Sequence, residues 1–161
     1  MNACKLAEQS LNFTQFVINN SLGDLSDADL LVRPVEGANH IAWQIGHLIV
    51  AERNMAKQLP GAQYPELPAG FAEKHANKPD AQNASGDFGT KAQYLELFNQ
   101  TRAATVAAVG KLSDADLDKP TSGPANINTV GGLLNLISNH TMMHGGQFSV
   151  VRRKLGKPVL F

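Results

Sequence analysis

The chain has 161 residues, and its 14 basic residues are balanced by 14 acidic ones, so the formal net charge at pH 7 is zero. This balance argues against nucleic-acid binding through a basic surface and against a polybasic membrane anchor. The hydrophobic fraction of 43% and the length predict one globular domain over residues 1–161. The sequence has no apolar run long enough for a membrane span and no leader-like N-terminus. We therefore expect a cytoplasmic protein that does not span a membrane.

Apolar periodicity predicts four helices, over Ala3 to Leu22, His40 to Leu59, Thr90 to Leu112 and Thr129 to Leu155. Gly23 follows the first helix, Pro60 ends the second, and Gly156 follows the fourth. Asn39 and Asn128 are the expected N-caps of the second and fourth helices. No segment alternates apolar and polar residues as a strand does, so the predicted fold class is all-α.

A six-residue repeat divides the chain into two similar halves. Leu25-Ser-Asp-Ala-Asp-Leu30 recurs as Leu112-Ser-Asp-Ala-Asp-Leu117, and each copy lies between two predicted helices. We interpret each copy as a short capped turn with two buried leucines. Two helix–loop–helix units of this kind are expected to pair into a four-helix bundle. If a pseudo-twofold axis relates them, the second and third helices are parallel, and the long Pro-rich loop at about 60–89 is the crossover between them.

His140 and His144 are the residues most informative about chemistry. They are four positions apart, so on a helix they lie on one face, one turn from each other. On a helical wheel they share the sector of Leu133, Ile137 and Phe148, which predicts that both rings point into the bundle. Two interpretations remain open, a pair of hydrogen-bonded core histidines or a pair of metal ligands.

A metal site needs at least a third ligand, and the candidates are the other three histidines. His47 lies in the middle of the second helix and is the preferred one. His40 is expected to be an exposed residue at the start of that helix, and His75 a solvated loop residue. Three histidines with an open position are typical of a catalytic metal site.

The segments Asn39-His-Ile-Ala-Trp-Gln-Ile-Gly-His47 and Asn139-His-Thr-Met-Met-His-Gly-Gly-Gln147 resemble the second and last helices of the DinB/YfiT-like superfamily of metal-dependent enzymes. The resemblance implies an up-down-down-up four-helix bundle, and a divalent metal, zinc or nickel, on His47, His140 and His144. It also implies a homodimer and, from some relatives, transfer of a low-molecular-weight thiol. Members of the superfamily often carry Arg directly after the last histidine, where this chain has Gly145.

The predicted function is therefore that of a metal-dependent enzyme acting on a small molecule, by thiol transfer or by hydrolysis. The alternatives are a bundle that binds a metal or small molecule without catalysis, and a purely structural bundle. Gln147 and Trp43 are expected near the metal or in the substrate pocket, and no catalytic residue is assigned. Glu52 and Glu36 are candidate general bases.

Overall fold

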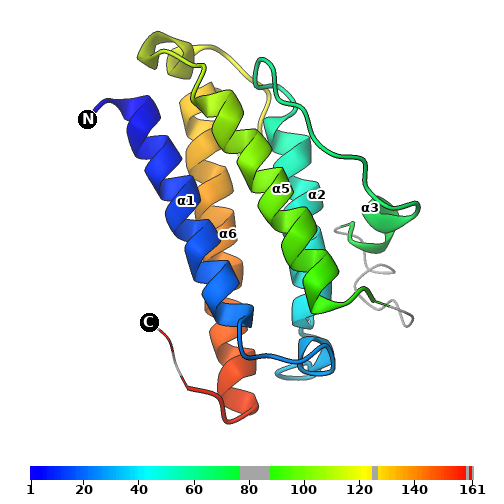
Figure 1. Ribbon diagram of the computed structural model, residues 1–161. Coiled ribbons are helices and arrows are strands. Elements are labelled where there is room, and N and C mark those ends of the chain that lie inside the picture. The colour runs from blue at the N-terminus through cyan, green and yellow to red at the C-terminus, as the bar shows by residue number, and fades with distance from the viewer. Residues whose placement is uncertain (77–87, 125–126, 159, 161) are drawn as a thin grey trace.

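The computed structural model describes residues 1–76, 88–124, 127–158 and 160. Four long helices form the bundle, and they are α1 (Ala3–Leu22), α2 (Ile41–Ala56), α5 (Lys91–Val109) and α6 (Val130–Lys154). α2 and α5 run parallel to each other and opposite to α1 and α6, which is the predicted up-down-down-up topology (Figure 1). Within the described ranges, the β-structure is a single isolated bridge between Pro120 and Thr129. No helix in these ranges is long and apolar enough to cross a membrane.

Most helix ends follow the sequence signals, but α2 ends at Ala56 and α5 at Val109, each three residues before the predicted end at Leu59 and Leu112, and two N-caps are shifted by one residue. Gly23 and Gly110 follow α1 and α5 directly, and Gly156, at φ 69°, follows the last turn of α6. The predicted caps Asn39 and Asn128 are wrong, because the next residue caps the helix in each case. Nδ1 of His40 accepts from the Trp43 backbone N–H, and the Thr129 hydroxyl accepts from that of Gly132.

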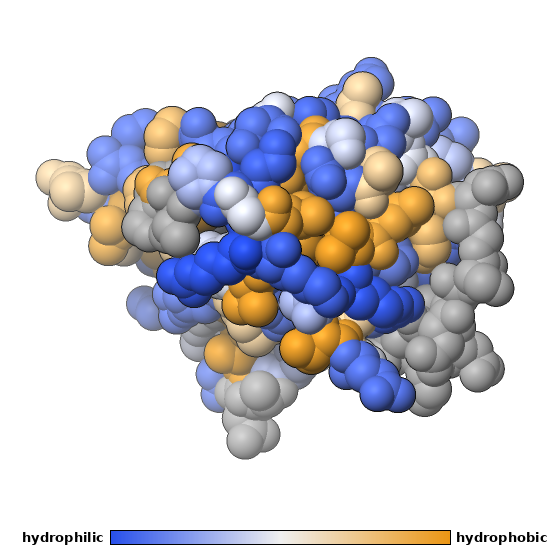
Figure 2. All heavy atoms as spheres, turned by 90° about the horizontal axis from the view of Figure 1, so that it is seen from below, coloured by the Kyte–Doolittle hydropathy of each residue, from blue (hydrophilic) through white to orange (hydrophobic). Residues whose placement is uncertain are grey.

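Each copy of the repeated hexapeptide forms a short 3-10 helix, η1 (Asp29–Leu31) and η2 (Asp114–Asp118). The serine and the second aspartate of each copy bond to each other's backbone or side chain, as expected for a capped turn. Leu25 and Leu30 are buried as predicted, whereas Leu112 and Leu117 are only half-buried. The leucines of the first copy belong to the apolar core at the lower end of the bundle, and the surface of the molecule seen from below carries hydrophobic atoms among hydrophilic ones (Figure 2).

A buried ion pair lies at the centre of the bundle. Arg102 of α5, 0% exposed, donates to both carboxylate oxygens of Glu52 on α2, with its Nε 2.9 Å from Oε1 and its Nη2 2.9 Å from Oε2. Nη1 donates to the Leu11 carbonyl and the Thr14 hydroxyl of α1, and Nη2 also donates to the Thr141 hydroxyl of α6. One guanidinium therefore contacts all four long helices.

The crossover between α2 and α5 contains a four-residue helix, α3 (Phe71–Lys74), which is followed by His75. The His75 ring packs directly against the backbone of Gly46 on α2, and a Cβ placed on Gly46 would lie 2.1 Å from the ring atom Cδ2. Nδ1 of His75 donates to the Phe71 carbonyl at 2.8 Å, and Nε2 accepts from the Tyr94 hydroxyl at 2.9 Å. Glycine at position 46 is what lets the crossover lie this close to α2.

His75 and His40 are both buried, at 1% and 4% exposure, so the prediction that they are exposed is wrong. The reason in both cases is a set of contacts from distant parts of the chain. Tyr94, 19 positions along the chain, packs on His75 together with the neighbouring Phe71, and the ring of Phe88 packs edge-on against that of His40, with 4.4 Å between centroids. Burial lowers the pKa of each histidine to about 4, so both are neutral at pH 7.

Replacing Arg102 by methionine is expected to lower the free energy of unfolding by about 3–5 kcal/mol, because it leaves the Glu52 carboxylate buried without its partner. Urea denaturation followed by circular dichroism measures the change. The double variant Arg102→Met, Glu52→Leu should recover much of the loss. Lys5→Met, which removes the exposed ion pair with Glu8, is the control and should change little. An equal loss in the single and double variants would contradict the assignment.

Two glycine-to-alanine variants are expected to act in opposite directions. Both glycines are inside helices, where alanine is intrinsically preferred by about 1 kcal/mol. Gly146→Ala on α6 meets nothing within 4 Å and should raise the free energy of unfolding by about 0.5–1 kcal/mol. Gly46→Ala should lower it, by about 1–3 kcal/mol, because the new methyl group displaces His75. Stabilisation by both variants would show that His75 does not pack against α2.

Candidate metal centre

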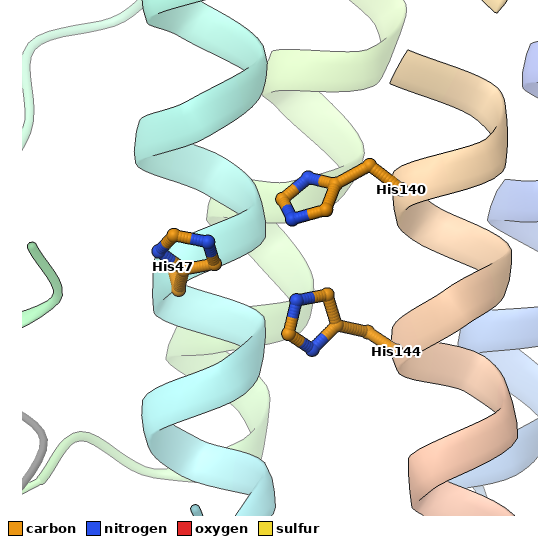
Figure 3. A group of neighbouring side chains, drawn as sticks. All are labelled: His47, His140 and His144. Atoms are coloured by element: carbon orange, nitrogen blue, oxygen red, sulfur yellow. The ribbon is translucent and has the colours of Figure 1, made fainter. Parts of the chain in front are cut away.

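Three histidines from two helices lie together on the seam between α2 and α6. One ligand atom each from His47, His140 and His144 can be chosen so that all three lie within 4.8 Å of one another. The rings turn toward each other across the seam (Figure 3), with the centroid of His47 5.2 Å from that of His140 and 5.5 Å from that of His144. The structure thus brings together the three histidines that the sequence singled out.

The sequences of the two helices explain this arrangement. His140 and His144 are one turn apart on the inward face of α6, and their ring centroids are 4.9 Å apart. As predicted, the apolar residues of the same sector, including Ile137 and Phe148, are buried. His47 lies midway along α2, which runs antiparallel to α6, so its ring reaches the same level.

Hydrogen bonds to oxygen atoms set the orientation of two of the rings. Gln44, 1% exposed, donates through Nε2 to the Asn39 carbonyl at 2.8 Å, so its Oε1 is left to accept from Nδ1 of His144 at 2.8 Å. Nδ1 of His47 donates to the His75 backbone carbonyl at 3.3 Å. In both rings the proton is therefore on Nδ1, and Nε2 keeps a free lone pair. An oxygen acceptor on the outer nitrogen is the usual support of a metal-ligating histidine.

All three imidazoles are neutral at pH 7. Burial, followed by the neighbouring His140 and His47, lowers the pKa of His144 to about 3. Burial and the proximity of His47 lower the pKa of His140 to about 4, and burial also lowers that of His47. A neutral imidazole is the form that binds a metal ion, so these histidines need to lose no proton before binding one.

Of the two other expected site residues, Trp43 lies next to the cluster and Gln147 is exposed. The indole of Trp43 is 2% exposed and stacks on the His47 ring, with centroids 4.9 Å apart and planes 7° apart. Its Nε1 is buried, and no residue in the described part of the chain accepts a hydrogen bond from it. Gln147 lies on α6 beyond His144 with an exposed side chain.

Neither candidate general base lies at the histidine cluster, and Gly145 is packed against another helix. The Glu52 carboxylate is bound by Arg102, and Glu36 is exposed in the loop between α1 and α2. Gly145 faces α1, where a Cβ would be 3.4 Å from Val17. A longer side chain at position 145 would therefore meet α1.

Gln44 and the His75 carbonyl are the functional features that sequence reasoning missed. Gln44 is three residues before His47 on the same helix. A buried glutamine in an apolar helix needs hydrogen-bond partners, which is a weak sequence signal that Gln44 bonds to another side chain. The contribution of His75 comes from its backbone and from a contact across 28 positions of the chain. Local sequence carries no signal for such a contact.

Comparisons with known proteins agree with this description. A family model of the DinB superfamily matches residues 11–148. A conserved protein from Enterococcus faecalis has a similar structure, with a TM-score of 0.74 and 16% sequence identity over 98% of this chain and 99% of that protein. YfiT from Bacillus subtilis, described as a probable metal-dependent hydrolase with an unusual four-helix bundle topology, gives a TM-score of 0.68 and 16% identity over 96% of this chain and 89% of YfiT. No curated protein sequence matches the chain.

At 16% identity the two solved structures show the fold alone, which is the four-helix bundle described above. The family model adds a match in the sequence itself, and the matched range contains the whole of α2 and all three clustered histidines. This chain therefore belongs to the DinB superfamily.

Proposed function

We propose that this protein is a divalent-metal-dependent enzyme in which His47, His140 and His144 hold a zinc or nickel ion. The observation that carries the proposal is the convergence of three neutral imidazoles within 4.8 Å. The donor set fits, because imidazole nitrogen suits both ions. When bound, such an ion supplies Lewis acidity, which polarises a substrate group or makes water or a thiol more acidic.

The surrounding residues support binding rather than simple burial. Gln44 and the His75 carbonyl hold the outer nitrogens of His144 and His47, and so present Nε2 to an ion. The cluster in the described part of the chain consists of three histidines, and three protein ligands are typical of catalytic sites, which keep a position for water or substrate. A purely structural pair of core histidines would not need the third ring.

The reaction that we propose is hydrolysis of a small molecule or transfer of a thiol to one. Hydrolysis is supported by the similarity to YfiT, whose description is that of a probable metal-dependent hydrolase. Thiol transfer is supported by the resemblance of the histidine segments to those of superfamily members that use thiols. With the carboxylate of Glu52 held by Arg102, we assign no protein general base.

Metal content is the direct test of the three-histidine site. Protein purified without a histidine tag or chelators should contain close to one zinc or nickel ion per chain by plasma mass spectrometry. His144→Ala should lose it, because two ligands hold an ion much more weakly than three.

His40→Asn is the matched control, since it removes a buried histidine outside the cluster and asparagine is also a good N-cap. It should keep the metal. No metal in the wild-type protein, and none taken up on titration with either ion, would overturn the proposal.

Zinc affinity is expected to fall much less between pH 7 and about pH 5.5 than it would for three histidines of ordinary pKa, because burial lowers the pKa of His47, His140 and His144. In the folded chain, protons compete for His140 and His144 only near pH 4 and pH 3. Three ordinary histidines of pKa about 6.5 would lose affinity by up to about a thousandfold per pH unit in the acidic range. Competition with a chromophoric chelator measures the affinity, and a steep loss between pH 6.5 and 5.5 would contradict the prediction.

Circular dichroism should accompany each point of this titration. The folded-state pKa values of these histidines lie below the unfolded value of about 6.5, so the unfolded chain binds more protons in the range between them. The stability of the metal-free protein therefore falls as the pH drops below about 6.5. Affinities are compared only where the chain remains folded.

A further inference from the structure

A small groove continues from the histidine cluster along the seam between α2 and α6. It has a volume of about 260 Å³ and is lined by Ala51, Asn54, Met55, Pro124, Leu136 and His140. Ala51 is one turn after His47 on α2, and Leu136 is one turn before His140 on α6. Because these helices are antiparallel, both residues lie on the same side of the cluster. The groove and the candidate metal centre therefore share His140 as a common wall.

The lining of this groove is almost entirely apolar. Ala51, Met55, Leu136 and Pro124 supply the hydrophobic surface, and none of the described lining residues carries a formal charge at pH 7. Among these described residues, Asn54 and His140 have the polar side chains, and the Asn54 amide is exposed. A charged group placed here would gain no partner of opposite charge among the described lining residues, whereas an apolar group would gain free energy in proportion to its buried area.

The size of the groove limits what it can take. A pocket for a whole drug-sized ligand has a volume of about 300–1,000 Å³, and this one is smaller. It fits one arm of a molecule whose reacting end is at the histidines. It does not fit a large cosubstrate lying entirely within it.

From this geometry we propose that the enzyme acts on substrates with a short, uncharged apolar arm, which binds between Ala51 and Leu136 beside the reacting group. The inference rests on the proposed function, because the reacting group is the one held at the three histidines. It specifies this arm of the substrate as aliphatic or otherwise apolar, and disfavours a charge on the arm close to the reacting group.

The test uses cobalt(II) as a spectroscopic substitute for the native ion and simple thiols as probes. Cobalt-loaded protein is titrated with ethanethiol, butanethiol and pentanethiol, and with 3-mercaptopropionate as the charged comparison. Binding is followed by the thiolate-to-cobalt absorption band. Each added methylene should lower the dissociation constant by about fourfold until the groove is full, and 3-mercaptopropionate should bind more weakly than butanethiol.

Ala51→Phe fills the groove and should abolish the dependence on chain length, and cobalt uptake by this variant is measured alongside to check that the three histidines still bind the ion. Ala103→Phe is the matched control, because it adds the same ring at an exposed position of α5, and it should keep the chain-length dependence.

Failure of the inference and failure of the proposed function give different results. If the protein takes up no cobalt, the three-histidine site is wrong, and the inference is overturned with it. If cobalt binds but affinity does not rise with chain length, or 3-mercaptopropionate binds as tightly as butanethiol, the apolar-arm inference alone is overturned. If Ala51→Phe retains the chain-length dependence, the arm does not bind in this groove.

Discussion

The buried pair of Arg102 and Glu52 is the interaction on which the arrangement of the four helices depends. A guanidinium without solvent must have all its N–H groups satisfied and its charge balanced, and the acceptors here come from α1, α2 and α6. This requirement fixes the rotation of each helix about its axis more narrowly than apolar packing does, because hydrogen bonds are directional. The two apolar clusters of the core pack on either side of it along the bundle.

The same network reaches the candidate metal centre through one residue. Thr141 donates to the Ile137 carbonyl and accepts from Arg102, and it lies between His140 and His144 in the chain. These bonds fix the rotation of α6 about its axis, so the face of α6 that carries His140 and His144 is directed toward α2. α2 contributes both Glu52 and His47. The ion pair and the histidine cluster are therefore parts of one packing arrangement.

The four helices and the pairing of His140 with His144 could be predicted because they depend on short-range patterns, whereas the prediction of His47 depends on its mid-helix position and on the family resemblance of its segment. Helix period, the stop signals at Gly23 and Gly156, and the four-residue spacing of His140 and His144 are local features. The buried states of His40 and His75 could not be predicted, since Phe88 and Tyr94, which enclose them, are distant in sequence. The contact of Gln44 with His144 joins residues 100 positions apart. Because α2 is apolar on most of its surface, its sequence pattern does not show which way the side chains of Gln44 and His47 point.

The two halves of the sequence repeat in their backbone but not in their candidate metal ligands. Leu25 and Leu112 are equivalent positions, which sets an offset of 87 residues between the halves. At this offset His47 corresponds to Leu134, and His140 and His144 correspond to Arg53 and Lys57. The backbone thus repeats while the ligands do not. A symmetric pair of first halves would bring together one imidazole, an arginine and a lysine, and a symmetric pair of second halves would bring together two imidazoles and a leucine. The complete set of three imidazoles therefore exists only in the covalently joined, unequal pair.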